Sequence, residues 1–153
     1  MKIRKSRLIL FAPFCLIPAL AGADEFMFEV ASPVAAQGFV SKTAAFVFRT
    51  AGCTDPDKAQ ISATAEGVAD GTRRNLVLRV TPSKPGVYAV FQQWNSGRWV
   101  VVLKGSCGPR QAGAVIPVGP RGFVREDSKF FTHPATAAEI EAALKAFPEG
   151  GYK

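Results

Sequence analysis

Apolar and polar residues alternate along most of the chain, which is the pattern of β-strands with one buried face. The strongest signal lies in residues 86–103, where two runs rich in valine and aromatic residues flank the turn sequence Asn95-Ser96-Gly97. The other runs with strand character are 26–30, 43–50, 59–66, 75–80 and 112–118. The run 75–80 is expected to end at Thr81-Pro82.

Short strands with almost no helix between them indicate an all-β fold class. Turn-forming residues separate the runs roughly every 8–12 residues, as they do in two-sheet sandwiches. We therefore predict an all-β fold, an immunoglobulin-like β-sandwich of about seven strands with a C-terminal α-helix. The sandwich is expected to occupy residues 24–119.

A helical pattern replaces the alternation near the C-terminal end. Thr136 and Glu139 have the spacing of a capping box, in which hydroxyl and carboxylate each bond a backbone amide at the helix start. Apolar residues follow at helical spacing, namely Ile140, Ala143, Leu144 and Phe147. We predict an amphipathic helix over residues 136–147. Residues 120–135 show no periodicity and are expected to form an extended connection, either functional or loosely ordered.

Residues 1–23 have the three parts of a secretory signal peptide. A basic start precedes the apolar residues 8–20, and Ala21-Gly22-Ala23 forms a cleavage site. The apolar run is too short to span a membrane and is interrupted by Pro13 and Pro18. We predict cleavage near Ala23, export to the periplasm or the extracellular space, and no membrane span in the mature chain.

Cleavage changes the charge of the protein. The whole chain has 19 lysines and arginines against 12 acidic residues, a formal net charge of +7. Four of the basic residues and none of the acidic ones lie in residues 1–23, which leaves 15 against 12, a net charge of +3. This small excess does not indicate nucleic acid as a partner.

Two cysteines remain in the mature chain, Cys53 and Cys107. An even pair in an oxidising compartment typically forms a disulfide, whereas a redox or metal pair requires C-x-x-C spacing or nearby histidines. Cys53 follows the second predicted strand and Cys107 the sixth, and these strands exit at the same end of an immunoglobulin-like sandwich. We predict a disulfide at the rim of the fold.

The sequence Gly86-Val87-Tyr88, followed by Gly97-Arg98-Trp99, resembles small immunoglobulin-like domains of bacterial exported proteins, including the FixH-like and related periplasmic type. In those domains a glycine-led tyrosine strand precedes a glycine-led tryptophan strand. The resemblance covers residues 43–104. It implies a β-sandwich fold and an exported location, and it transfers no functional residue.

The sequence contains no recognisable catalytic motif. His133 is the only histidine, and Asp55 and Asp57 supply too few oxygen ligands for a calcium site. A hydrolase would require His133 beside a serine and a carboxylate. We therefore predict a protein that is not an enzyme and has no metal or cofactor.

Aromatic and polar residues near the turns are the remaining candidates for function. The expected contacts are Trp94, Arg98, Phe123, Phe130, Phe131 and His133. We predict a non-enzymatic module that recognises another protein of the bacterial envelope. The helix 136–147 either packs on its own sandwich or docks on that partner. The alternative is a carbohydrate- or small-ligand-binding domain that uses an exposed Trp94, with Trp99 in the core.

Overall fold

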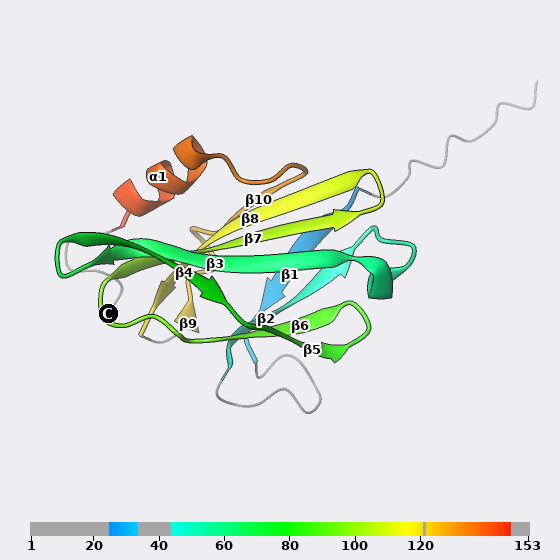
Figure 1. The fold of residues 1–153 in the computed structure, drawn as a ribbon, viewed down its shortest axis with the longest axis horizontal. Helices are drawn as coiled ribbons and strands as arrows, with labels where there is room; N and C mark the ends of the chain where they lie inside the picture. Colours follow the sequence, from blue (N-terminus) through cyan, green and yellow to red (C-terminus); the bar gives the residue numbers. More distant parts are fainter. Residues whose placement is uncertain (1–24, 34–43, 121, 148–153) are drawn as a thin grey trace, which may run out of the picture.

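The computed structural model describes residues 25–33, 44–120 and 122–147. The predicted signal peptide, residues 1–23, lies outside this part of the chain. The described residues form two antiparallel sheets packed face to face, with a helix on the outside of the larger sheet (Figure 1). This is the predicted all-β sandwich with a C-terminal helix. No helix in the described ranges has the length and hydropathy that a membrane span requires.

Ten strands make up the two sheets of the described residues. Sheet A has the order β1-β2-β6-β5 and contains β1 (Met27–Ala31), β2 (Ala44–Ala51), β5 (Val80–Lys84) and β6 (Val87–Phe91). Sheet B has the order β10-β8-β7-β3-β4, with β9 also paired to β8. Its strands are β3 (Gln60–Ala69), β4 (Thr72–Leu78), β7 (Arg98–Cys107), β8 (Arg110–Gly119), β9 (Gly122–Phe123) and β10 (Lys129–Phe131). A short 3-10 helix, Pro56–Lys58, lies between β2 and β3.

The strand order is that of an immunoglobulin domain. If β1 to β8 are lettered A, B, C, C′, D, E, F and G in chain order, the sheets read A-B-E-D and G-F-C-C′. The chain therefore crosses between the sheets after β2, after β4 and after β6. Strands β9 and β10 extend sheet B beyond β8.

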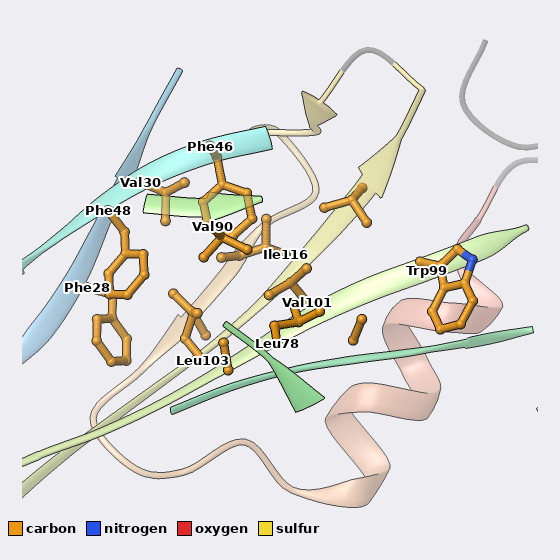
Figure 2. Close-up of a cluster of buried hydrophobic side chains, with 14 of the residues drawn as sticks. Phe28, Val30, Phe46, Phe48, Leu78, Val90, Trp99, Val101, Leu103 and Ile116 are labelled. Atoms are coloured by element: carbon orange, nitrogen blue, oxygen red, sulfur yellow. The ribbon is translucent and has the colours of Figure 1, made fainter. Parts of the chain in front are cut away.

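The core lies between the inner faces of the two sheets, and aromatic rings dominate its sheet A side (Figure 2). Phe28 and Phe48 are almost fully buried and meet edge to face, with ring centroids 5.5 Å apart. Strand β3 contributes small residues to the same core, among them Ala63 and Ala65. Facing sheets lie about 10 Å apart, so large rings from one sheet require small side chains elsewhere to reach native packing density.

Trp99 belongs to this core, as predicted. It is opposite Gly67 in the pairing of β7 with β3, and its ring lies over that glycine. A Cβ atom at residue 67 would come within 2.6 Å of the indole ring. Glycine is therefore required at this position because a neighbouring strand places a large ring directly above it.

The predicted fourth strand is two strands in the structure. Strand β4 ends at Leu78 in sheet B and β5 begins at Val80 in sheet A, so the chain changes sheets at Arg79. The prediction that Thr81-Pro82 ends the strand is wrong, because β5 continues through Pro82. Proline is tolerated there since β5 is the last strand of sheet A and needs ladder hydrogen bonds on one side only.

The segment 120–135, expected to be an extended connection, contains two short strands that pair with β8. Strands β9 and β10 both pair with β8. Between them, the Val124 amide still donates a hydrogen bond to the Pro117 carbonyl oxygen of β8, and residues 125–128 lie outside the ladder. The Ser128 hydroxyl donates a hydrogen bond to the Val124 carbonyl oxygen at 2.7 Å and so closes this excursion. Strands of two and three residues are too short to produce a visible alternation, which is why the sequence pattern did not reveal them.

The C-terminal helix α1 (Ala137–Lys145) packs on the outer face of sheet B, above β7 and β8 (Figure 1). Thr136 is its N-cap and forms the predicted capping box with Glu139. The contact is apolar and includes Val100, Val102, Val115, Ile140, Leu144 and Phe147. Of the two arrangements left open by the sequence, the structure shows docking on the protein's own sandwich. The apolar stripe of α1 is therefore already covered and does not serve as a partner surface.

Gly113 allows the chain to reach the helix. Residues 133–135 pass directly over β8 at this glycine. A Cβ atom there would lie 2.7 Å from the Ala135 amide nitrogen and closer still to the His133 carbonyl oxygen. Any side chain would therefore push the segment away from the sheet together with the start of α1.

A disulfide joins Cys53 to Cys107 where β2 and β7 end, with the two Cα atoms 5.9 Å apart. Beside it, the Arg110 guanidinium donates a hydrogen bond to the Gly52 carbonyl oxygen at 2.7 Å. Both interactions connect the loop after β2 to the β7–β8 hairpin. They lie at the end of the sandwich. Cys53 is in the loop after β2, as predicted, whereas Cys107 is the last residue of β7 and not part of the loop that follows it.

Candidate functional site

The residues predicted to contact a partner do not form one surface. Two of them line a groove at the edge of the sandwich, two lie beside helix α1, and two lie in the β6–β7 crossing and at the first residue of β7. In that order they are Phe123 and Phe130, Phe131 and His133, and Trp94 and Arg98. The groove combines apolar side chains with open space for a ligand.

Trp94 is buried, which contradicts its expected role as an exposed binding residue. Its exposed fraction is 5%, and it belongs to the same hydrophobic core as Trp99. The chain changes sheets between β6 and β7, and this crossing brings Trp94 against the core. Its ring is therefore not available to stack on a sugar. Arg98 is exposed at the start of β7 and does not line the groove.

An open groove of about 650 Å³ follows β1, the strand at one edge of sheet A. Strands β1 and β2, the β5–β6 turn and the segment after β8 all contribute to its walls. The lining includes Met27, Phe28, Glu29, Phe123, Arg125 and Phe130. The groove thus joins residues from both sheets on the open side of the sandwich.

Phe130 projects into this open side. In β10 it pairs with Ala114, whose side chain is in the core, so Phe130 is on the inner face of sheet B. Because β10 is the last strand of that sheet, 44% of Phe130 is exposed. Its neighbour Phe131 faces the other way and packs in the cluster under α1. Phe123 contacts Phe46, with ring centroids 5.9 Å apart, and so links the groove to the core.

Strands β1 and β10 each have one unpaired edge within the described residues. Strand β1 pairs with β2 alone, and β10 pairs with β8 alone. The two strands lie close to each other across the gap between the sheets. A free edge presents backbone N–H and C=O groups that have no ladder partner. The groove therefore offers apolar side chains and backbone hydrogen-bonding groups together.

The charged side chains of the groove are mainly basic. Arg49 pairs with Glu29 across β2 and β1, with the side-chain atoms 2.5 Å apart. Lys84 and Arg125 also line the groove, so three cations stand against one carboxylate. In the part of the chain that the structure describes, the guanidinium of Arg125 forms no ion pair. The groove consequently has a net positive lining.

His133 lies at the base of α1 and outside the groove. Its Nδ1 atom is 2.9 Å from the Pro134 carbonyl oxygen, which only accepts, so Nδ1 carries a proton. Its Nε2 atom is 3.7 Å from Oε1 of Glu139. The Thr136 amide and hydroxyl both donate to Oε2 of Glu139, at 2.7 and 2.8 Å. These bonds cap the helix. The Thr136 hydroxyl donates its proton to Glu139 and not to His133, so these three residues do not have the arrangement of a catalytic triad.

The capping bonds make the stability of α1 depend on pH. The Thr136 amide, followed by the Thr136 hydroxyl, lowers the pKa of Glu139 below its ordinary value of 4.5, and His133 acts in the same direction. Ionised Glu139 therefore stabilises the folded state above its ordinary pKa, and this contribution is lost as the pH falls through the lowered one. We expect Glu139→Gln to remove that dependence, so that the variant loses less stability than the wild type between about pH 5 and pH 3. Urea unfolding at each pH measures the difference.

Glu126→Gln is the matched control for this measurement. It makes the same chemical change on an exposed residue outside the helix. We expect it to follow the wild-type curve. If Glu139→Gln and the wild type lose stability in parallel on acidification, the carboxylate of Glu139 does not support the helix in solution.

Other titratable groups do not form a second candidate site. Within the described ranges, no three histidine, cysteine, aspartate or glutamate side chains are close enough together to hold a metal ion. A shallower hollow lies beside Tyr88 and Asp57. Burial, and secondarily the Asp57 carboxylate, raises the pKa of Tyr88, so the phenol is neutral near pH 7. Tyr88 stacks on Phe48 with ring centroids 5.2 Å apart, and its role is therefore in packing.

The sequence did not identify β1 as part of a site, and it indicated Arg125 only as a member of the candidate contact segment 123–133. Alternation over residues 26–30 predicts a strand with one buried face, but it contains no information on whether that strand lies at an edge. One signal was present, because Met27 is an apolar residue at an outward position of the alternation. A large apolar side chain at such a position indicates contact with something beyond the sheet.

Comparisons with known proteins identified no relative of this chain. No family model, no curated protein and no solved structure matches the chain. The proposals below therefore rest on the sequence and the structure of this chain.

Proposed function

We propose that this protein is an exported, non-enzymatic binding module that recognises another protein of the bacterial envelope through the groove along β1. The observation that carries the proposal is the exposure of large apolar side chains at one open edge of the sandwich. The exposed large hydrophobic residues of the described ranges are Met27, Val77 and Phe130. Two of these three, Met27 and Phe130, line the same groove.

Exposed apolar side chains that gather in one place favour a protein contact. Phe130 supplies a large rigid ring, and Met27 supplies a flexible side chain that adapts to the shape of a partner. Phe123 and Phe28 continue the apolar surface inward to the core. A contact built in this way has a buried aromatic centre, which is where binding energy concentrates in protein interfaces.

The shape of the groove favours a segment of protein chain over a small enclosed ligand. Its volume is in the range of ligand pockets, yet it is open along the length of a strand. The carbohydrate alternative required an exposed Trp94, and that tryptophan is buried.

Two features support an exported location. Residues 1–23 have the pattern of a cleavable signal peptide, and the disulfide between Cys53 and Cys107 is typical of proteins in oxidising compartments. The resemblance of residues 43–104 to FixH-like and related periplasmic domains points to the same compartment. An export test is direct, since the mature protein is expected to begin near Asp24 and to contain no free thiol.

Site-specific photo-crosslinking tests the proposed binding surface. A photoreactive phenylalanine analogue replaces Phe130 in the full-length chain, which is expressed in its native cells and irradiated. The matched control carries the analogue at Val77, a more exposed site on β4 at the opposite edge of sheet B. We expect one discrete crosslinked protein from position 130 and not from position 77.

The crosslink must also depend on the charge and shape of the groove. Arg125→Glu in the same background is expected to weaken the product, because Arg125 lines the groove. Absence of any product at position 130, or equal products at both positions, would show that the β1 groove is not the partner surface.

A further inference from the structure

We propose that the partner binds as an extended segment that adds a strand to the free edge of β1, with apolar side chains directed at Phe130 and an acidic residue facing Arg125. The inference rests on the proposed function and specifies the chemistry of the partner. It follows from the backbone, the side chains and the charges of the groove.

The backbone of β1 is suited to accept a strand. Strand β1 is the last strand of sheet A on this side, and no described residue pairs with its outer edge. Its five residues, Met27–Ala31, present roughly 17 Å of edge. An added strand satisfies the free N–H and C=O groups through main-chain hydrogen bonds, which supply affinity without a particular sequence.

The side chains of the groove set the alternation that the added strand needs. Phe28 and Val30 of β1 point into the sandwich, and Phe130 approaches from the inner face of sheet B. Every second side chain of the added strand therefore contacts these apolar side chains. The residues between them lie on the outer side, next to Met27 and Glu29. Small polar residues fit there because the Glu29 carboxylate is already paired with Arg49.

The charge of the groove selects between occupants. Arg125 is exposed and has no ion-pair partner among the residues that the structure describes. Arg49, which is paired with Glu29, and Lys84 also line the groove. A second copy of this chain would bring the same positive charges against them, which disfavours edge-to-edge self-pairing. An acidic partner segment is favoured instead.

A synthetic peptide provides a defined probe. The sequence acetyl-Glu-Val-Thr-Val-Thr-Val-Glu-amide places valine on the inner side, threonine on the outer side and glutamate at both ends. It reads the same in either direction, so the probe requires no assumption about parallel or antiparallel pairing. Binding to the mature, oxidised protein is measured by isothermal titration calorimetry at low salt, with peptide up to millimolar concentration.

Two altered peptides separate the parts of the proposal. N-methylation of every internal amide removes the hydrogen-bond donors of both strand edges and keeps the side chains, and we expect it to weaken binding by about tenfold or more. Replacement of both glutamates by lysine is expected to weaken binding by about fivefold, the range of exposed ion pairs. Hydrogen exchange should also slow at residues 27–31 when the original peptide is bound.

A charge exchange tests Arg125 itself. In Arg125→Glu two cations and two carboxylates line the groove, so the preference for the glutamate peptide over the lysine peptide is expected to disappear. Arg74→Glu is the matched control, since Arg74 is exposed on β4 at the far edge of sheet B. This control is expected to keep the wild-type preference for glutamate.

The outcomes separate this inference from the proposed function. If the glutamate peptide fails to bind, or binds equally well when N-methylated, strand addition is overturned, whereas a crosslink at position 130 still supports a protein partner at the groove. If the crosslink is also absent, the proposed function fails as well. A dimer of the protein alone that disappears with Phe130→Asp would overturn the acidic partner in favour of a second copy.

Discussion

Replacing Phe48 by alanine is expected to lower the free energy of unfolding by about 3–5 kcal/mol. Phe48 is 1% exposed in the middle of the core. Its ring meets Phe28 of β1 edge to face and stacks on Tyr88 of β6, with centroids 5.5 and 5.2 Å apart. The substitution therefore removes contacts that join three neighbouring strands of sheet A and leaves a cavity that the sandwich fills only in part. Urea unfolding of the mature protein measures the loss.

Phe130→Ala is the matched control for this prediction. It makes the same chemical change at a ring that is largely exposed on β10. We expect the midpoint of unfolding to move little, because a surface substitution typically changes stability by no more than about 0.5 kcal/mol. Equal urea midpoints for Phe48→Ala and the wild type would contradict the position of Phe48 in the core.

Removal of the disulfide is expected to cost about 4 kcal/mol in the chain-entropy model. Cys53 and Cys107 are 54 residues apart in sequence, so the bond restricts a long loop of the unfolded chain. The double substitution Cys53→Ala with Cys107→Ala removes the bond without leaving a free thiol. Thermal and urea unfolding of the oxidised wild type and the double variant give the difference.

The reducing agent gives an independent check on the same bond. The oxidised wild type should lose stability when dithiothreitol is added, whereas the double variant should not respond. The hydrogen bond from Arg110 to Gly52 spans the same two loops and remains in the variant. It keeps the rim partly connected, so we expect a less stable fold and not a different one. Two titratable thiols in the denatured, unreduced wild type would show that the cysteines are not bonded.

The groove was only partly visible from the sequence, for a physical reason. Phe123 and Phe130 stood out as apolar residues in a segment without periodicity, and both line the groove. Trp94 stood out equally and is buried, because the crossing between β6 and β7 brings it against the core. Exposure depends on what the rest of the chain places over a residue. Local composition does not contain that information.

Local patterns alone determined much of the architecture of this protein. Alternation at period two marked most of the strands, and the spacing of Thr136 and Glu139 marked the start of α1. Both patterns arise from the geometry of a single segment, so the secondary structure of that segment can be predicted without knowing what packs against it.

The tertiary structure decided which strands are edges, where the chain changes sheets, and what covers the helix. The unbroken alternation through residues 75–80 conceals the change of sheet at Arg79, because a strand in either sheet has the same period. Likewise, the apolar stripe of α1 showed that something must cover it, and only the outer valines of β7 and β8 showed what does. The free edge of β1 also could not be predicted from the local pattern. It follows from which strands pair, and pairing is a property of residues distant in sequence.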